Sequence, residues 1–251
     1  MTGDSDRRIS TCAQHGDYES VKTGQKIVLW SKCPTCLQDH EREVQALLVQ
    51  ADRDRAAAAI LARLEAIGVP LRFHGATLDG FEASTPAQAK VKDWALAYLA
   101  SLTADRKNGK SAILLGRPGT GKTHMACALA VAAADRGISA RYATVMRAIR
   151  RVKDSWRPEA SETEREVIAD YADCGLLVLD EVGIQTGSQF ESNILFDLLN
   201  RRYECCRPTI LVSNLVLSEI QKFLGERILD RLREDGGQML AFDWESHRRK
   251  P

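Results

Sequence analysis

The fold of this chain can be inferred from the stretch Gly116-Arg-Pro-Gly-Thr-Gly-Lys-Thr123, which fits the pattern G-x-x-x-x-G-K-[ST]. The apolar run Ser111–Leu115 leads into it as a buried strand would. The residues Lys122–Ala134 are rich in Ala and Leu and predict a helix that ends at Gly137. Strand, glycine-rich loop and helix are the context of a P-loop, whose backbone N–H groups bind phosphate oxygens. We therefore expect this part of the chain to bind a nucleoside triphosphate.

Individual residues of this loop have separate expected tasks. Lys122 would reach the β- and γ-phosphates, and Thr123 would place its hydroxyl on Mg²⁺. A glycine-rich turn without a ligand is the alternative, but it gives no reason for the strand and helix on either side. The residues expected to contact the nucleotide are Gly116, Pro118, Gly119, Thr120, Gly121, Lys122, Thr123, His124 and Asp180.

The chain around the P-loop alternates between apolar runs and helical segments. This alternation predicts an α/β fold in which a parallel sheet carries helices on both faces. Ligands of such sheets bind outside the carboxyl ends of the strands. The expected strands are Ile138–Thr144, Gly175–Glu181 and Pro208–Asn214, and the expected helices are Ala87–Leu102, Val145–Ser155 and Gln189–Tyr203.

Two acids and an amide fall at such strand ends. Asp180 can hold Mg²⁺, mostly through water, and Glu181 can polarise the water that attacks the γ-phosphate. Asn214 ends another strand and could orient the same water. An acidic pair after a strand is also typical of a turn or a helix cap, but the neighbouring P-loop favours the catalytic interpretation.

The N-terminal segment carries a second signal. Cys12-x-x-His15 and Cys33-x-x-Cys36 are two pairs of metal-ligand residues whose spacing suits a zinc ribbon or knuckle. Such a set predicts a structural Zn²⁺ site, which would supply the folding energy that so small a lobe lacks. The alternative is a coincidence of small buried residues. The other cysteines, expected in the core, are Cys127, Cys174, Cys205 and Cys206.

The chain is expected to fall into three parts. From Asp39 to Ile67 it contains neither Gly nor Pro, and it predicts one long helix or two abutting helices that Gly68-Val-Pro70 ends. A solvated helix accounts for its mixed charges, and a coiled-coil arm is the alternative. The expected domains are a zinc-ribbon-like module over 1–38, a helical connector over 39–68 and a nucleotide-binding domain over 69–251.

Composition excludes several classes of protein. The 251 residues carry a net charge of +1, so any contact with nucleic acid depends on local patches. No apolar run is long enough for a membrane span, and no signal-peptide pattern opens the chain. Seven cysteines, an odd number, argue against a disulfide framework. We expect a cytoplasmic protein without a membrane partner.

Basic residues in two regions are candidates for phosphate contacts. Arg227 and Arg231 lie one helical turn apart and could stabilise a transferring phosphoryl group in a neighbouring subunit, whereas Arg248 could act within its own chain. A basic helical segment before Glu181 could bind DNA phosphates without sequence preference, and a solvated basic face is its alternative. Its residues are Arg147, Arg150, Arg151 and Lys153.

These motifs together resemble the AAA+ ATPases of the DnaC/DnaI-type helicase-loader family, and the related IstB-type transposition helpers share much of the pattern. The resemblance covers roughly residues 68–250. It implies ATP and Mg²⁺ as cofactors, Asn214 as sensor 1 and Arg231 as the arginine finger. It also implies Arg248 as the sensor 2 arginine, with Arg227 as a second candidate for the finger. The motifs that carry it are Gly116–Thr123, Leu176–Glu181, Leu211–Asn214, Gly225–Arg231 and Trp244–Arg248.

The resemblance also implies partners. A zinc head and connector would grip the hexameric replicative DNA helicase, the subunits would self-associate through their ATP interfaces, and single-stranded DNA would run through the assembly. Two alternatives stay open: an IstB-like transposition helper ATPase that acts on duplex DNA, and an ATP-switched adaptor whose hydrolysis is incidental. The cysteine pairs and the ending Trp244–Arg248 favour the loader over the transposition helper.

Overall fold

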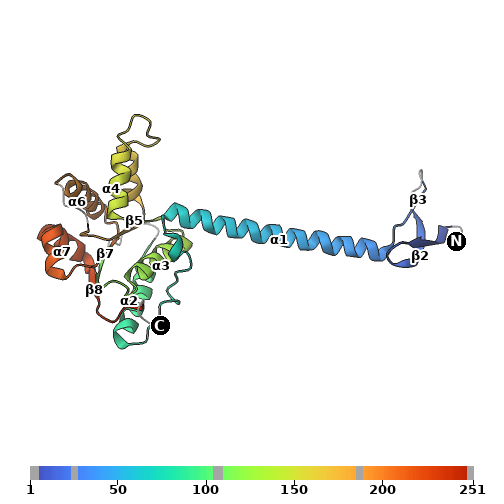
Figure 1. The fold of residues 1–251 in the computed structure, drawn as a ribbon, viewed down its shortest axis with the longest axis horizontal. Helices are drawn as coiled ribbons and strands as arrows, with labels where there is room; N and C mark the ends of the chain where they lie inside the picture. Colours follow the sequence, from blue (N-terminus) through green and yellow to red (C-terminus); the bar gives the residue numbers. More distant parts are fainter. Residues whose placement is uncertain (1–5, 24–27, 104–109, 185–188, 248–251) are drawn as a thin grey trace. The chain divides into compact units, whose positions relative to one another are not determined.

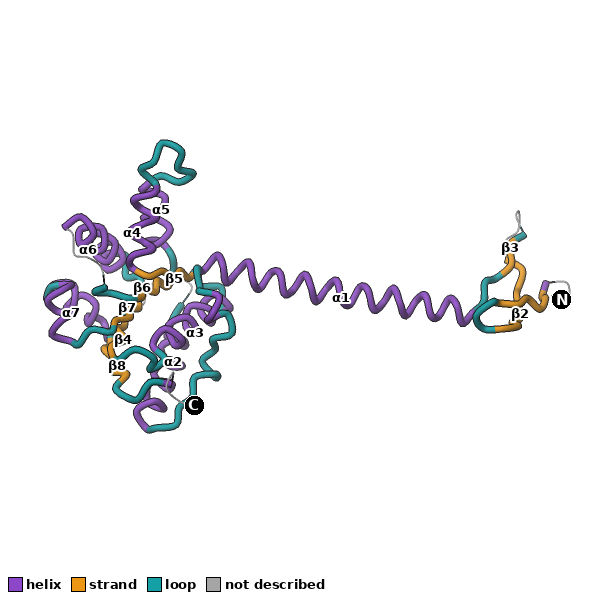
Figure 2. Tube along the Cα trace, in the orientation of Figure 1, coloured by secondary structure: helices purple, strands orange, loops and turns teal. Residues whose placement is uncertain are grey.

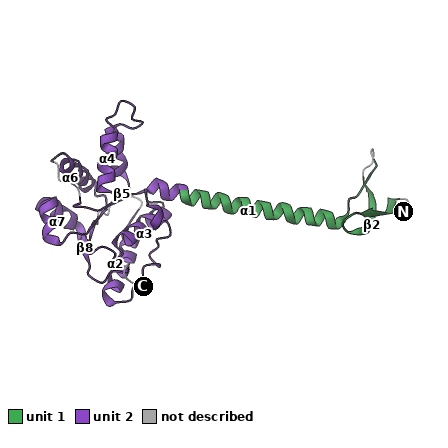
Figure 3. Ribbon diagram, viewed as in Figure 1, with its two compact units in different colours: residues 1–61 green, residues 62–251 purple. Residues whose placement is uncertain are grey.

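The computed structural model describes residues 6–23, 28–103, 110–184 and 189–247. The chain divides into two compact units, Met1–Leu61 and Ala62–Pro251 (Figure 3). We describe each unit by itself.

The first unit consists of a small antiparallel sheet and most of a long helix. Strands β1 (Arg7–Cys12), β2 (Gly16–Thr23) and β3 (Leu29–Trp30) lie in the order β1-β2-β3. Helix α1 (Pro34–Ile67) is a single helix and begins five residues before the predicted start at Asp39. Pro34 can open it because the first helical position needs no backbone N–H. Cys36 therefore lies in the first turn of the helix.

The final turns of α1 belong to the second unit. Leu64 and Ile67 are its buried residues, and Arg63 forms an ion pair of 2.6 Å with Asp135. The helix ends at Gly68, which has a φ of +90°. A left-handed residue of this kind is a common helix terminator because glycine adopts it without steric cost.

The second unit is built on a five-stranded parallel sheet with the order β5-β6-β7-β4-β8 (Figures 1 and 2). Every strand residue of β6 and β7 is buried, as expected for strands covered on both faces. The strand bounds are β4 (Ala112–Gly116), β5 (Ala140–Thr144), β6 (Leu176–Asp180), β7 (Thr209–Ser213) and β8 (Gln238–Phe242).

Helices cover both faces of this sheet, and each face has its own apolar cluster. Helices α2 (Pro86–Ser101) and α3 (Lys122–Asp135) pack on one face. The other face carries α4 (Val145–Asp154), α5 (Glu164–Asp173), α6 (Gln189–Glu204), α7 (Leu217–Leu224) and α8 (Glu226–Arg233). Short 3-10 turns are η2 (Leu71–Phe73) and η3 (Glu234–Gly236). The predicted α/β fold with a parallel sheet between two helical layers is confirmed.

The burial of the cysteines differs in part from the sequence-based expectation. Cys127 and Cys174 are buried as predicted, but Cys205 and Cys206 are exposed, so the prediction for these two was wrong. They follow the last residue of α6, and Cys206 has a φ of +51° that turns the chain toward β7 at the surface. Among the described helices, none combines the length and apolar character that a bilayer span requires.

Candidate ATP site and candidate metal centre

The P-loop forms at the carboxyl end of β4 and opens α3. Gly121 has a φ of +94° and immediately precedes Lys122, the first residue of the helix. Lys122 Nζ donates to the carbonyl oxygens of Gly116 and Arg117 at 2.7 and 2.8 Å, so the ammonium group lies within the loop. A Cβ atom on Gly116 would lie 2.3 Å from the carbonyl oxygen of Phe242, so this position requires glycine.

The acid pair lies at the end of β6, beside the loop. Asp180 is 5% exposed, and its Oδ2 accepts hydrogen bonds from Thr123 Oγ1 at 2.8 Å and from the Tyr142 hydroxyl at 2.7 Å. Its Oδ1 accepts the backbone N–H of Glu181 at 2.7 Å. A threonine hydroxyl and a carboxylate at this spacing are oxygen ligands of the kind Mg²⁺ takes beside nucleotide phosphates. These residues therefore fit a magnesium ion.

Glu181 adopts an unusual backbone conformation. Its φ of +59° lies in the left-handed region, which is unfavourable for a residue with a Cβ atom. Strain of this kind persists where the surrounding structure enforces it, and it occurs often at catalytic positions. The conformation places an exposed carboxylate directly after the buried Asp180.

Most of the predicted nucleotide-binding residues line a cavity of about 290 Å³. Glu181 and Asn214 line it together with the P-loop, so the predicted water-activating and water-orienting residues face the same space. Arg72, Phe73 and His247 also line it. Thr120 is fully buried, and its hydroxyl donates to the carbonyl oxygen of Arg117. It therefore stabilises the loop without lining the cavity. The P-loop residues in the lining are Pro118, Gly119, Gly121, Lys122, Thr123 and His124.

The segment after β8 forms two hydrogen bonds with the P-loop. Trp244 Nε1 donates to the carbonyl oxygen of Thr120 at 3.0 Å, and the backbone N–H of His247 donates to that of Gly119 at 2.9 Å. The ending Trp244–Arg248 was noted in the sequence, but its contact with the loop was not predicted. Arg248 itself lies outside the described residues.

The two finger candidates on α8 lie away from this cavity. Neither Arg227 nor Arg231 is among its lining residues. The Arg231 guanidinium carbon lies 4.8 Å from the ring centroid of Tyr203, which holds that side chain by a cation–π contact. Arg227 is exposed.

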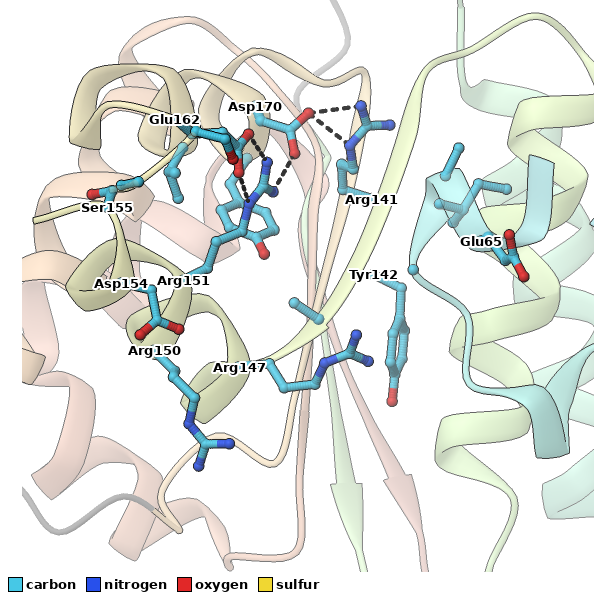
Figure 4. A pocket seen from close by; sticks show the side chains of 18 of the residues that line it. Glu65, Arg141, Tyr142, Arg147, Arg150, Arg151, Asp154, Ser155, Glu162 and Asp170 are labelled. Carbon is cyan, nitrogen blue, oxygen red and sulfur yellow. Dashed lines mark hydrogen bonds and ion pairs between the residues drawn. The ribbon is translucent and has the colours of Figure 1, made fainter. Parts of the chain in front are cut away.

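The four basic residues of α4 divide into two pairs. Arg151 forms ion pairs with Glu162 and Asp170, and Lys153 forms one with Glu191 at 3.1 Å. The hydrogen bond to Glu162 raises the pKa of Arg151. Figure 4 shows Arg151 directed at these acids, whereas Arg147 and Arg150 are exposed and make no ion pair within the described part of the chain.

An exposed aromatic pair lies at the end of α4 and was missed in the sequence. Trp156 and Phe190 are 49% and 37% exposed, and their ring centroids lie 5.0 Å apart in an edge-to-face arrangement. Lys153 Nζ lies 5.7 Å from the centroid of Phe190. Exposed rings beside a cation are a known type of platform for unpaired bases. The sequence alone does not predict this pair, because its two residues are far apart in the chain.

Cys12, His15, Cys33 and Cys36 converge at one point in the first unit. Their ligand atoms all lie within 4.8 Å of one another. The Cys12 and Cys36 sulfurs are 3.4 Å apart, and His15 Nδ1 lies 3.3 Å from Cys36 Sγ. Tetrahedral zinc–thiolate bonds of about 2.3 Å place two sulfurs about 3.8 Å apart, so the four groups fit Zn²⁺.

The surroundings of these residues favour metal binding. Backbone N–H groups of Gln14 and His15 lower the pKa of Cys12 to about 6, whereas the hydrogen bond to Cys12 raises the pKa of Cys36 to about 11. Asp39 on α1 lies 3.1 Å from His15 Nε2, which leaves Nδ1 to face the thiols. A carboxylate behind a metal-binding histidine orients the ring in this way in zinc proteins. The cluster therefore joins the β1–β2 turn to the start of α1.

Parallel sheet, P-loop, strand-end acid pair and asparagine define an ATP-binding fold of the AAA+ type. A family model described as "IstB-like ATP binding protein" matches residues 39–251. The chain thus belongs to the family of IstB-like ATP-binding proteins. Its curated relatives include the replicative helicase loader DnaC of Escherichia coli K12, which is 28% identical over 98% of this chain and 95% of its own length. DnaC of Buchnera aphidicola from Acyrthosiphon pisum is 30% identical over 72% of both chains.

Solved structures agree on the fold. The crystal structure of the DnaC helicase loader superposes with a TM-score of 0.60 at 22% identity, covering 68% of this chain and 99% of that one. The crystal structure of DnaI superposes with a TM-score of 0.58 at 22% identity, covering 68% and 93%. Both superpositions extend over less than the whole of this chain.

Proposed function

We propose that this protein is an ATP-dependent loader that binds the hexameric replicative DNA helicase and delivers it onto single-stranded DNA. The observation that carries the proposal is the extent of the similarity to Escherichia coli DnaC, which spans 98% of this chain. A similarity confined to the ATPase unit would leave the partner open. This one also includes the first unit.

The ATP site suits hydrolysis as well as binding. The P-loop would hold the phosphates, and Thr123 and Asp180 would hold Mg²⁺, which neutralises charge on the phosphate oxygens. Glu181 would accept a proton from the attacking water, and Asn214 would orient that water from the end of the neighbouring strand β7. Arg231 of a neighbouring subunit would approach the γ-phosphate, so that a subunit alone turns over slowly.

The surface of α4 suits single-stranded DNA. Arg147 and Arg150 would contact phosphates, whereas bases would stack on Trp156 and Phe190. Arg151 and Lys153 are engaged with acids, so we assign them to holding α4 against its neighbours. Stacking selects unpaired bases, which supports the loader over a helper that acts on duplex DNA.

The first unit would contribute the grip on the helicase. Cys12, His15, Cys33 and Cys36 would hold Zn²⁺, which stabilises the turn between β1 and β2 against the start of α1. Exposed apolar residues along α1, among them Leu47 and Leu48 at 64% and 56% exposure, would be available to a partner.

Replacing Glu181 by Gln tests whether hydrolysis is part of loading. Loss of the general base should lower ATP turnover by about 100-fold or more while ATP binding stays unchanged. We expect a Glu181→Gln variant to bind the helicase yet fail to release it on single-stranded DNA, measured by helicase unwinding assays. Normal loading by this variant would support the adaptor with incidental hydrolysis instead.

A further inference from the structure

The hydroxyl of a core tyrosine donates a hydrogen bond to Asp180, the expected magnesium ligand, although this tyrosine belongs to none of the nucleotide-binding motifs. Tyr142 lies on β5, is 4% exposed and belongs to the apolar cluster beneath α2 and α3. Its hydroxyl donates to Asp180 Oδ2 at 2.7 Å. It is not among the residues that line the 290 Å³ cavity, so it acts on the site through Asp180.

The three donors to Asp180 differ in their other tasks. Thr123 would also be a ligand of Mg²⁺, and the N–H of Glu181 belongs to a strained residue at a strand end. The Tyr142 hydroxyl has neither constraint, because its ring is packed in the core and its backbone is paired in the sheet. Of the three, it is the donor best able to keep the carboxylate in one orientation.

The backbone of Tyr142 lies directly against the end of α1. A Cβ atom on Gly68 would lie 2.4 Å from the carbonyl oxygen of Tyr142, so the helix terminus and β5 are in close contact here. Glu65 and Gly68 line a cavity of about 1050 Å³ together with Tyr142 and Arg147 (Figure 4). Tyr142 thus lies between the last turn of α1 and the magnesium ligand.

We propose that Tyr142 is a positioning residue that fixes the Asp180 carboxylate for Mg²⁺-dependent ATP binding and joins it to the end of α1. This inference rests on the proposed ATPase function. The Tyr142 side chain does not line the ATP cavity, so we expect it to affect ATP binding only when Mg²⁺ is present. Nucleotide binding in the absence of Mg²⁺ is then independent of the hydroxyl.

A Tyr142→Phe variant of the full chain tests this, because it removes the hydroxyl and keeps the ring in the core. We expect the Mg²⁺ concentration that half-maximally stimulates binding of a fluorescent ATP analogue to rise about tenfold, as for loss of one hydrogen bond to a charged group. Affinity in EDTA should stay unchanged. Tyr98→Phe is the matched control, since Tyr98 is 5% exposed and its buried hydroxyl has no hydrogen-bond partner in the described structure.

A double-mutant cycle with Asp180→Asn separates positioning from packing. If Tyr142 acts through Asp180, Tyr142→Phe will not change Mg²⁺ dependence further in the Asp180→Asn background. An unchanged Mg²⁺ dependence in Tyr142→Phe, or equal losses of affinity with and without Mg²⁺, would overturn the proposal. A wild-type protein without Mg²⁺-dependent ATP binding would instead contradict the proposed function.

Discussion

Arg202 is the largest fully buried side chain in the described structure, and its nearest partners are carbonyl groups rather than acids. It lies on α6 and connects the end of α5 to the start of β7. Its guanidinium donates to the backbone oxygens of Tyr171, Ala172, Cys174 and Pro208 and to Thr209 Oγ1, at distances of 2.6 to 3.0 Å. The negative end of the α5 dipole adds to this stabilisation.

Replacing Arg202 by Met should lower the free energy of unfolding by about 3 kcal/mol, because several buried carbonyl groups lose their donor together. Urea denaturation measures the change. The adjacent Arg201 is the control: it is 43% exposed and pairs with Asp173, and its replacement by Met should cost less than about 1 kcal/mol. Similar losses in both variants would show that the buried contacts of Arg202 add little.

For single residues, the sequence predicts a role where that role depends on neighbours within a short motif. Lys122, Thr123 and Asp180 could be assigned because the P-loop and the strand-end acid are short motifs with a fixed context. Tyr142 and Arg202 could not, because their partners are brought to them by the tertiary fold. Tyr142 and Asp180, for example, are 38 residues apart in the sequence.

The β1–β2 hairpin and the first turn of α1 form one structural element if zinc joins them. A Cys12→Ser variant should lose bound zinc, measured by elemental analysis, and the β1–β2 hairpin should become sensitive to protease. Cys205→Ser is the control, because Cys205 is an exposed free thiol outside the cluster. Wild-type protein purified without zinc but with a protease-resistant N-terminus would contradict the metal's structural role.

Helix ends show which part of an element can be predicted. The end of α1 at Gly68 follows from glycine chemistry and was predicted. Its start at Pro34 was not, because proline suits a turn as well as the first position of a helix. Helix α5 was omitted, yet Thr163 and Glu166 form a capping box that the sequence contains.

At the scale of the whole molecule, the position of Arg231 predicts an assembly. Arg231→Ala and Glu181→Gln should each lower ATP turnover, by about 1,000-fold for a lost arginine finger. In a mixture, an Arg231→Ala subunit keeps Glu181 and can receive Arg231 from its neighbour, so activity should be partly restored. A steady-state ATPase titration of one variant with the other measures this.

Arg227→Ala in the same titration distinguishes the two finger candidates. Arg227 is exposed one turn earlier on α8 and, among the described residues, has no ring contact like that between Arg231 and Tyr203. If Arg227 rather than Arg231 is the finger, only mixtures that contain Arg227→Ala will recover activity. Recovery in neither mixture would argue that the site is complete within one chain.

The central claim is that this protein binds a replicative helicase. The most direct measurement is native mass spectrometry of the full chain mixed with the hexameric replicative helicase of its host, with ATP and Mg²⁺ present. The proposed function predicts a stable complex with several copies of this chain per hexamer, weakened by Cys12→Ser. Absence of any complex from a preparation that binds ATP, together with ATP-dependent assembly on duplex DNA, would contradict it.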